Sequence, residues 1–322
     1  MKNIILFDTS VGTTNKGDDI IMESAELGLQ NITKGNFVVK IPTHITPFSI
    51  LQTRTWWKAK WVENADLKFI CGTNLFAKNL MYPTNDLNVN LLNCKPLKNS
   101  VFLGIGNSML DKKTNWYTQY VYKSILSKEY IHGTRDDETT EMLKEYGFNA
   151  VTTGCPTLWG LTPEFCHDIP KDKADEVVFT LTGSQRDCTK DQDMVDTLKR
   201  NYKKRYFYVQ TIWDMDYFNS LQGLEDVEIV SPNIDQYSEF LNTHDVDYIG
   251  TRLHGGVYSM QHKKRAIIIS IDNRARNINK VSNLNTLDRK NIDELETLIR
   301  SRIITDIRVD YSTLDRWLSQ FK

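Results

Sequence analysis

The feature that most constrains the fold is a regular alternation of short apolar runs with helix-like segments. In the first half of the chain, the runs that we predict to be strands are residues 3–8, 36–41, 67–71, 100–106, 130–133 and 149–153. Helical patterns lie between them, for example at residues 19–30 and 135–147. Short runs that are apolar throughout are typical of strands buried on both faces of a parallel sheet that is covered by helices.

The same pattern begins again after a polar, proline-containing stretch at residues 162–176, which we interpret as an interdomain linker. The strands predicted beyond it are residues 176–183, 205–212, 226–231, 245–250 and 265–270. A chain of 322 residues is long for one domain and suits two. We therefore predict an α/β fold of two Rossmann-like domains that face a cleft, residues 1–165 and 166–322. The segment 312–322 has the pattern of an amphipathic helix. One interpretation is that this helix crosses back and packs against the first domain.

The composition excludes several classes of protein. The net charge is −1, so no global attraction to nucleic acid is expected, and any anion chemistry must come from locally placed arginines. Five cysteines without C-x-x-C pairs argue against structural zinc and disulfides and indicate a reducing compartment. The N-terminus has no signal-peptide pattern, and no apolar run approaches the roughly 20 residues that span a bilayer. We expect a cytoplasmic protein, with the inner face of the membrane as an alternative location.

In the second half of the chain, arginines follow predicted strands at the points where those strands end. Arg186 follows the first of these strands, Arg252 the fourth and Arg274 the fifth. Since the carboxyl ends of parallel strands meet at one edge of a sheet, the three arginines are expected at that edge. A helix N-terminus adds backbone N–H groups and partial positive charge, and arginine adds a bidentate fork for phosphate or carboxylate. The pattern predicts a site for a small, highly charged anion, although each arginine alone is also consistent with a surface position.

Two histidines and one basic run have competing interpretations. His254 can transfer a proton near neutral pH, or it can be a hydrogen-bonded structural residue that orients its loop. His132 is interpreted as structural, and residues 263–265, Lys-Lys-Arg, as a solvated turn before a strand. No cluster of His, Asp or Glu with ligand spacing predicts a metal site.

A polar loop in the first domain follows the first predicted strand, and Gly17 and Asp18 lead from it into a helix. The loop lacks the G-x-G-x-x-G pattern and the lysine of a P-loop, so it predicts neither a dinucleotide site nor an ATP site. One interpretation of Asp18 is a helix-capping acid. The functional alternative is that Asn15 and Asp18 bind acceptor hydroxyls, or that Asp18 removes a proton from one.

Together these motifs resemble those of the polysaccharide pyruvyl transferases over nearly the whole chain. Residues 15–18, Asn-Lys-Gly-Asp, are similar to the family's N-terminal Asn-x-Gly-Asp motif. Residues 71–74 resemble a degenerate form of its glycine-rich loop, and residues 134–136 resemble its Arg-Asp segment. Cys155 stands where many members have the Asp of an Asp-Pro pair. The most specific match is residues 252–254, Arg-Leu-His, followed by a helix, an apolar strand and Asp-Asn-Arg.

This resemblance implies a glycosyltransferase-B-like fold and an enzyme that moves the enolpyruvyl unit of phosphoenolpyruvate onto a sugar of a cell-surface glycan, usually as a ketal. It assigns to the donor Arg186, Arg252, Leu253, His254, Gly255 and Arg274, to the acceptor Asn15, Gly17, Asp18, Asn74 and Arg135, and to catalysis His254, Asp18 and Arg252. Phosphoenolpyruvate is then the donor substrate, and no cofactor or metal is implied. The departures at residues 71–74 and 155 leave the acceptor sugar open.

Elementary chemistry agrees with this implication. Phosphoenolpyruvate carries a phosphate and a carboxylate, which suit two arginines and a helix N-terminus. Ketal formation needs a proton at the methylene carbon and the removal of protons from two sugar hydroxyls, for which His254 is a candidate. Two other functions remain as alternatives. One is a glycosyltransferase with a nucleotide-sugar donor, and the other is a non-catalytic anion-binding or glycan-binding protein.

Three tryptophans, Trp56, Trp57 and Trp61, are interleaved with basic residues in the segment 54–61. One interpretation is a helix that faces the core and has a basic rim. A second is contact with a lipid-linked glycan acceptor at the membrane surface, where tryptophan and basic residues are favoured. A third is stacking on a sugar ring.

Overall fold

The structure is a computed structural model that describes residues 1–77, 79–82, 86–107, 114–272, 278–279 and 281–322. The chain divides into two compact units. Unit 1 consists of Met1–Thr13, Ile21–Trp159 and Asp310–Lys322, and unit 2 consists of Thr14–Ile20 and Gly160–Val309. The structural boundary thus falls after Trp159, whereas the sequence-based boundary falls after residue 165. The short segment Thr14–Ile20 belongs to unit 2, although the sequence analysis placed it in the first domain.

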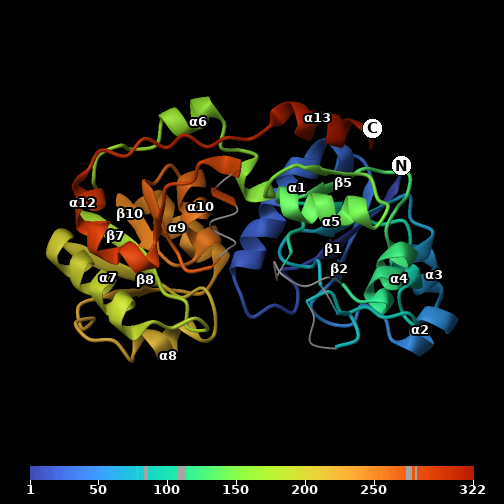
Figure 1. Cartoon of the computed structure of the whole chain (residues 1–322), viewed down its shortest axis with the longest axis horizontal. Helices are drawn as coiled ribbons and strands as arrows, with labels where there is room; N and C mark the ends of the chain where they lie inside the picture. Colours follow the sequence, from blue (N-terminus) through green and yellow to red (C-terminus); the bar gives the residue numbers. More distant parts are fainter. Residues whose placement is uncertain (78, 83–85, 108–113, 273–277, 280) are drawn as a thin grey trace. The chain divides into compact units, whose positions relative to one another are not determined.

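Unit 1 is built on a parallel sheet in the order β2-β1-β3-β4, beside a parallel pair β5-β6 (Figure 1). The strands are β1 (Asn3–Asp8), β2 (Phe37–Pro42), β3 (Leu67–Cys71), β4 (Val101–Leu103), β5 (His132–Thr134) and β6 (Ala150–Thr152). The helices are α1 (Gly17–Thr33), of which the part from Ile21 onward belongs to unit 1, α2 (Ile50–Thr55), α3 (Trp57–Glu63), η1 (Lys95–Leu97), α4 (Trp116–Ile125), α5 (Asp137–Glu145), η2 (Pro156–Leu158) and α13 (Tyr311–Ser319). β1 and β3 are buried on both faces, as their continuous apolar runs predict.

The C-terminal helix α13 completes the core of unit 1. Trp317 is buried, and its indole N–H donates to the carbonyl oxygen of Ile131 at 2.7 Å. The rings of Trp317 and Phe321 meet the ring of Phe69 on β3 at centroid distances of 6.4 and 4.8 Å. The amphipathic pattern at the chain end therefore exists because one face of α13 packs on the sheet of unit 1.

Unit 2 contains a parallel sheet in the order β12-β11-β10-β7-β8-β9 (Figure 1). Its strands are β7 (Glu176–Thr180), β8 (Lys204–Tyr208), β9 (Glu228–Val230), β10 (Val246–Gly250), β11 (Ala266–Ser270) and β12 (Thr286–Asp288). Its helices are α6 (Pro163–His167), α7 (Cys188–Asn201), α8 (Asp214–Phe218), α9 (Ile234–Thr243), α10 (Leu253–Gln261), η3 (Arg289–Glu294) and α12 (Leu295–Arg300). α7, α8, η3 and α12 share one hydrophobic core on a single face of this sheet. α10 packs on β10 and β11 from the other face, where Gly256 lies against Tyr248 and Ile268.

Arg265 corrects the interpretation of residues 263–265 as a solvated turn. Its side chain is 1% exposed and donates from Nη1 to Oδ2 of Asp247 at 2.6 Å. Nη2 donates to the carbonyl oxygens of Ile299 and Ser301 at 2.7 and 2.9 Å. The charge is tolerated inside because it is paired and hydrogen-bonded, and it ties the start of β11 to the end of α12.

His132 begins β5 and is fully buried in unit 1. The backbone N–H of Phe102 donates to Nδ1 at 3.1 Å, and Nε2 lies 2.9 Å from the carbonyl oxygen of Ser127. This geometry fits a neutral ring whose proton is on Nε2, because Nδ1 must accept a hydrogen bond. Burial lowers the pKa of His132 from 6.5 to about 4, although the bond to Ser127 opposes the shift.

The low pKa of His132 predicts a loss of stability in mild acid. The imidazole takes up a proton near pH 6.5 in the unfolded chain and only near pH 4 in the folded chain. The contribution of neutral His132 to the free energy of unfolding is therefore complete above pH 6.5 and is lost as the pH falls from 6.5 to 4. The total loss in the free energy of unfolding is about 3 kcal/mol. We expect urea unfolding of His132→Asn to show lower stability at pH 7 but a shallower decline towards pH 4 than the wild type. The exposed His167→Asn serves as the control; equal declines for wild type and His132→Asn contradict the prediction.

Candidate functional site

Three loops at the carboxyl ends of β7, β8 and β10 meet at Asp214, the first residue of α8. Asp214 is completely buried. The backbone N–H of Gly183 donates to its Oδ1 at 3.0 Å, and the backbone N–H of Thr211 donates to its Oδ2 at 2.9 Å. The hydroxyl of Thr211 adds a bond to Oδ1 at 2.8 Å. Asp214 therefore connects the loops after β7 and β8, and Arg252 brings in the loop after β10.

Arg252 precedes α10 and is 9% exposed. Its Nε donates to Oδ2 of Asp214 and to the carbonyl oxygen of Leu181, each at 3.2 Å. Its Nη2 donates to the hydroxyl of Thr211 at 2.7 Å and to Oδ1 of Asp214. The Nε/Nη2 fork, which sequence reasoning expected to face an anion, is thus used by Asp214. A contact of Arg252 with an anion has to use the Nη1 end of the guanidinium.

Beside this ion pair lies a small pocket of about 40 Å³. Its lining residues are Asn15, Thr182, Gln210, Thr251, Arg252, Leu253, His254, Ile271 and Asp272. His254 is the second residue of α10 and is 8% exposed, and Asp272 follows β11. The first turn of α10, which includes Gly255, presents backbone N–H groups and partial positive charge at this point. One pocket therefore combines a histidine, a carboxylate and a helix N-terminus.

The segment Thr14–Ile20 joins the same pocket from the N-terminal part of the chain. Asn15 forms an isolated antiparallel bridge with Thr211, and the backbone N–H of Lys16 donates to the carbonyl oxygen of Gln210 at 2.8 Å. Gly17 fits tightly here, because a Cβ at this residue would lie 2.8 Å from Nε2 of Gln210. The predicted acceptor residues Asn15 and Gly17 thus lie in unit 2 beside the predicted donor loop, and not in the first domain to which the sequence analysis assigned them.

Gln210 offers the pocket a hydrogen-bond acceptor. Oδ1 of Asn15 accepts from the backbone N–H of Gly17 at 3.0 Å, so the group of Gln210 that lies 2.9 Å from the same oxygen must be its amide nitrogen. Oε1 of Gln210 then lies towards Gly255, and it is buried without a hydrogen-bond partner among the described residues. A buried acceptor in this state favours a ligand that brings a donor, such as a hydroxyl.

Two other predicted site residues, Arg186 and Asp18, do not line this pocket. Nε of Arg186 donates to the carbonyl oxygen of Gly183 at 2.9 Å, and its exposed guanidinium lies 5.1 Å from the ring centre of Tyr217. Asp18 is buried in the first turn of α1, where its backbone N–H donates to the carbonyl oxygen of Asn15 at 3.0 Å. Arg274 lies outside the described residues.

The remaining two predicted acceptor residues contact each other in unit 1. Nη2 of Arg135 donates to Oδ1 of Asn74 at 2.5 Å, and the Arg135 side chain is buried. Gly106 makes room for this guanidinium, since a Cβ there would lie 2.2 Å from Nη2. The predicted acceptor set is therefore divided between the two units.

Asp214 and Gln210 were not predicted as site residues. Asp214 follows the predicted strand 205–212, as Arg186 follows the predicted strand 176–183, so the rule for the carboxyl ends of parallel strands covered it, but its negative charge did not fit the predicted anion site. Gln210 lay inside the predicted strand, and it follows the strand only in the structure, where β8 ends at Tyr208. In the described part of the chain, no group of three or more His, Cys, Asp or Glu residues is placed to hold a metal ion. Among the same residues, no helix is both long and apolar enough to cross a bilayer.

The sequence model of the polysaccharide pyruvyl transferase family matches residues 15–273, from the Asn15 segment to just beyond Asp272. The chain belongs to the polysaccharide pyruvyl transferase family. This pyruvyl transferase family member is therefore a transferase, as the motifs predicted. The comparison with curated proteins gave no match.

Solved structures that resemble the chain share its fold at low sequence identity. The UDP-GlcNAc 2-epimerase of Methanocaldococcus jannaschii, in complex with UDP-GlcNAc and UDP, is 11% identical with a TM-score of 0.57, over 99% of each chain. The Neisseria meningitidis UDP-GlcNAc 2-epimerase bound to UDP-GlcNAc is 10% identical with a TM-score of 0.51, over 92% of this chain and 91% of that one. Arabidopsis thaliana UGT89C1 complexed with UDP is 10% identical with a TM-score of 0.51, over 100% of both. These likenesses confirm the predicted α/β fold with two Rossmann-like, glycosyltransferase-B-like domains.

Proposed function

We propose that this protein transfers the enolpyruvyl unit of phosphoenolpyruvate to a hexose of a cell-surface polysaccharide precursor, forming a pyruvate ketal and releasing phosphate. The observation that carries the proposal is the pocket at the start of α10. There His254, Asp272 and the helix N-terminus lie beside a buried Arg252 that Asp214 holds in place. This arrangement suits a small anion that reacts by proton transfer.

The pocket suits one end of the donor. A cavity of about 40 Å³ is close to the volume of one or two water molecules, so a phosphate or carboxylate group enters it while the rest of the donor lies outside. The partial positive charge of α10 and the Nη1 end of Arg252 are the attractive groups. Because Asp214 already neutralises much of the guanidinium charge, we propose that Arg252 acts mainly by holding the start of α10 in position. Its backbone N–H also donates to the hydroxyl of Thr180 at 3.2 Å, which fixes the loop to β7.

The reaction can be written with balanced protons. A proton is added to the methylene carbon of phosphoenolpyruvate, one sugar hydroxyl forms a bond to the central carbon and loses its proton, and the C–O bond to phosphate breaks. A second hydroxyl then forms the other C–O bond of the ketal. Of the two hydroxyl protons, one ends in the new methyl group and the other on hydrogen phosphate. We assign the proton for the methylene carbon to His254 and a hydroxyl contact to Oε1 of Gln210. Asp18 stays the sequence-based candidate for the base, since its segment joins the pocket through Asn15.

A glycosyltransferase with a nucleotide-sugar donor is the second candidate. The observation in its favour is that the fold relatives named above were solved with UDP or UDP-GlcNAc. At 10–11% identity this likeness extends to the fold only. The match over residues 15–273 to the pyruvyl transferase family favours the first candidate.

Thermal unfolding with candidate donors separates these two functions. We expect phosphoenolpyruvate to raise the melting temperature, because a ligand at a hundred times its Kd adds about 2.7 kcal/mol to the native state. UDP and UDP-sugars should leave it unchanged. Arg252→Lys should reduce the response, since lysine cannot reproduce the bonds to Asp214, Thr211 and Leu181 together. Arg302→Lys, at an exposed arginine of unit 2, is the control; a response to UDP-sugars alone contradicts the proposal.

The acceptor in this proposal is a lipid-linked glycan precursor. The apolar and basic surface around Trp56, Trp57 and Trp61 supports it, because such a surface is suited to a membrane-bound substrate. A mass-spectrometric assay of phosphoenolpyruvate with lipid-linked and with free hexoses tests this part. Equal ketal formation on both would contradict the requirement for a lipid.

A further inference from the structure

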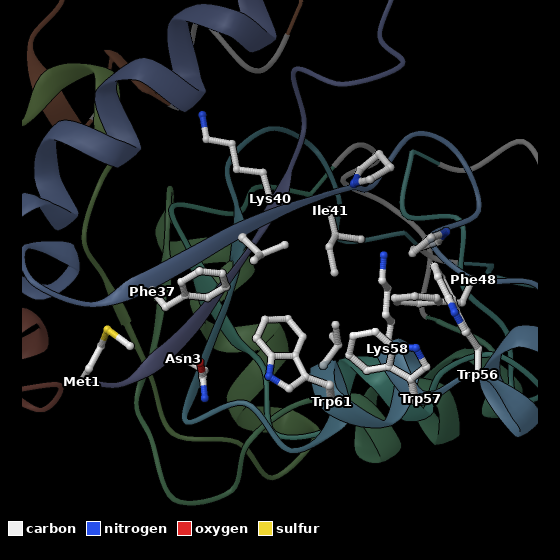
Figure 2. Close-up of a pocket in the computed structure, with 14 residues that line it drawn as sticks. Met1, Asn3, Phe37, Lys40, Ile41, Phe48, Trp56, Trp57, Lys58 and Trp61 are labelled. Carbon is white, nitrogen blue, oxygen red and sulfur yellow. The ribbon is translucent and has the colours of Figure 1, made fainter.

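A groove of about 730 Å³ lies on unit 1 and shares no residue with the pocket at α10 (Figure 2). The edge strand β2 supplies one wall, and the α2–α3 junction with α3 supplies the other. The residues that form most of these walls are Phe37, Val39, Ile41, Trp56, Trp57 and Trp61. Its size is in the range of small-ligand sites in proteins, and its walls are mainly apolar.

The walls are held in place by aromatic pairs at both ends. Trp61 meets Phe37 edge to face at 6.1 Å, and Trp56 meets Phe48 at 6.1 Å (Figure 2). α3 buries Ala59 and Val62, and Trp61 is partly buried against the core, whereas Trp57 is exposed. The groove is thus a preformed feature of unit 1, and the exposed Trp57 in its lining lies outside the core.

The apolar surface continues from the groove onto α2. No residue of α2 is buried, and Leu51 and Ile50 are 70% and 40% exposed. On α3, Trp57 is 67% exposed. Because α2 contacts α3, these exposed apolar side chains lie near the groove, and an exposed apolar patch on a folded protein marks a site of interaction.

Basic residues predominate near the groove. Residues 50–62 contain Arg54, Lys58 and Lys60 and no Asp or Glu, and the acidic Glu63 ends α3. All three basic side chains are exposed. Nζ of Lys58 lies 5.2 Å from the ring centre of Trp56 and 5.7 Å from that of Trp57, between the two walls. Lys40 differs, because it is paired with Glu26. Lys58 in the lining, with Arg54 and Lys60 close to it in sequence, therefore forms a cationic rim beside an apolar floor.

This combination selects the occupant. Recognition of a sugar needs hydrogen-bond acceptors as well as donors, but the walls offer mainly indole N–H and ammonium donors and no carboxylate. Tryptophan with exposed aliphatic residues and lysine or arginine is the composition of surfaces that lie in the headgroup region of a bilayer. An anionic phospholipid provides both an apolar chain for the floor and phosphate oxygens for the rim.

We propose that the surface formed by α2, α3 and this groove docks on a bilayer that contains anionic phospholipid. Trp57 and Leu51 enter the headgroup region, an acyl chain enters the groove, and Arg54, Lys58 and Lys60 contact lipid phosphates. Each basic residue near an anionic surface strengthens binding about fivefold. This inference does not depend on the proposed transferase reaction.

Vesicle co-sedimentation tests the proposal without any activity measurement. The full chain should bind vesicles that contain phosphatidylcholine and phosphatidylglycerol, and binding should weaken as salt is added. The double variant Trp57→Ser, Lys58→Gln should bind at least about tenfold more weakly and keep its melting temperature, since both side chains are exposed. The matched control is Trp116→Ser, Lys123→Gln on α4, which alters an exposed tryptophan and an exposed lysine outside the groove.

Four outcomes would overturn the proposal. They are no binding to anionic vesicles, equal binding to phosphatidylcholine alone, an equal loss in the α4 control, and a concentration-dependent dimer that the groove variant abolishes. The last would assign the groove to a second copy of the chain. If the double variant has a lowered melting temperature, Lys58→Gln alone is tested in its place. For this single variant we expect about a fivefold loss of vesicle binding. Unchanged vesicle binding of this single variant would show that the cationic rim does not contribute to binding.

Discussion

Asp214→Ala is expected to destabilise the protein by about 3–5 kcal/mol, because it leaves the buried Arg252 guanidinium without its ion-pair partner. The backbone N–H of Gly183 and of Thr211 lose their acceptor at the same time. The loops after β7, β8 and β10 should then separate. The affinity for phosphoenolpyruvate should decrease together with the stability, because these loops form the pocket, although Asp214 itself does not line it.

Urea unfolding is the measurement, with Asp216→Ala on the same helix as the control. Asp216 is exposed, so its loss should change stability by at most about 0.5 kcal/mol. The double variant Asp214→Ala, Arg252→Leu should be more stable than the sum of the two single variants implies, because it removes both charges of the pair. Strictly additive losses would show that the pair contributes no mutual stabilisation and would contradict the role given to Asp214.

The order of the elements was predictable because most strands are continuous apolar runs that can be recognised in the sequence. The apolar runs 3–8 and 67–71 coincide with β1 and β3, and residues 176–183 begin where β7 begins. β12 (Thr286–Asp288) was missed, since it has three residues and only Leu287 is buried. A strand of this kind is defined by pairing with β11, which no local pattern reveals.

The partners of the arginines were not predictable in the same way. Arg252 and its partner Asp214 are 38 residues apart, and Asp214 stands in a run with another acid, Asp216. Nothing local indicates which carboxylate turns inward. Arg265 shows the same limit, because two lysines precede it and its buried partner Asp247 lies on the neighbouring strand β10. Sequence placed Arg252 just after one strand and Arg265 just before the next, but their burial and their partners depend on tertiary packing.

The assignment of residues 15–18 to the acceptor side shows a related limit. The segment follows β1, so chain order placed it in the first domain. In the structure, bonds from Asn15 and Lys16 to the end of β8 bring it to unit 2. The motif is therefore a part of the candidate donor pocket through Asn15, and this contact, which spans 195 residues of sequence, depends on the fold.

His254→Gln is expected to lower turnover by about a hundredfold to ten-thousandfold, because the proposed reaction needs a proton at the methylene carbon. Glutamine keeps a hydrogen-bonding group of similar reach and cannot transfer a proton at neutral pH. The affinity for phosphoenolpyruvate should change little, since the helix N-terminus and Arg252 stay in place. His262→Gln at the other end of α10 is the control and should keep wild-type turnover.

The pH profile decides between the two roles of His254. If His254 delivers the proton, the wild-type profile contains its titration and the profile of His254→Gln lacks it. If His254 only holds the donor, affinity should fall, and the remaining turnover should keep the wild-type profile. Wild-type turnover together with wild-type affinity in His254→Gln would exclude both roles. The reaction would then have to take its proton from another group of the pocket, and Asp272→Asn is the variant that tests this next, because Asp272 is the carboxylate that lines the pocket with His254.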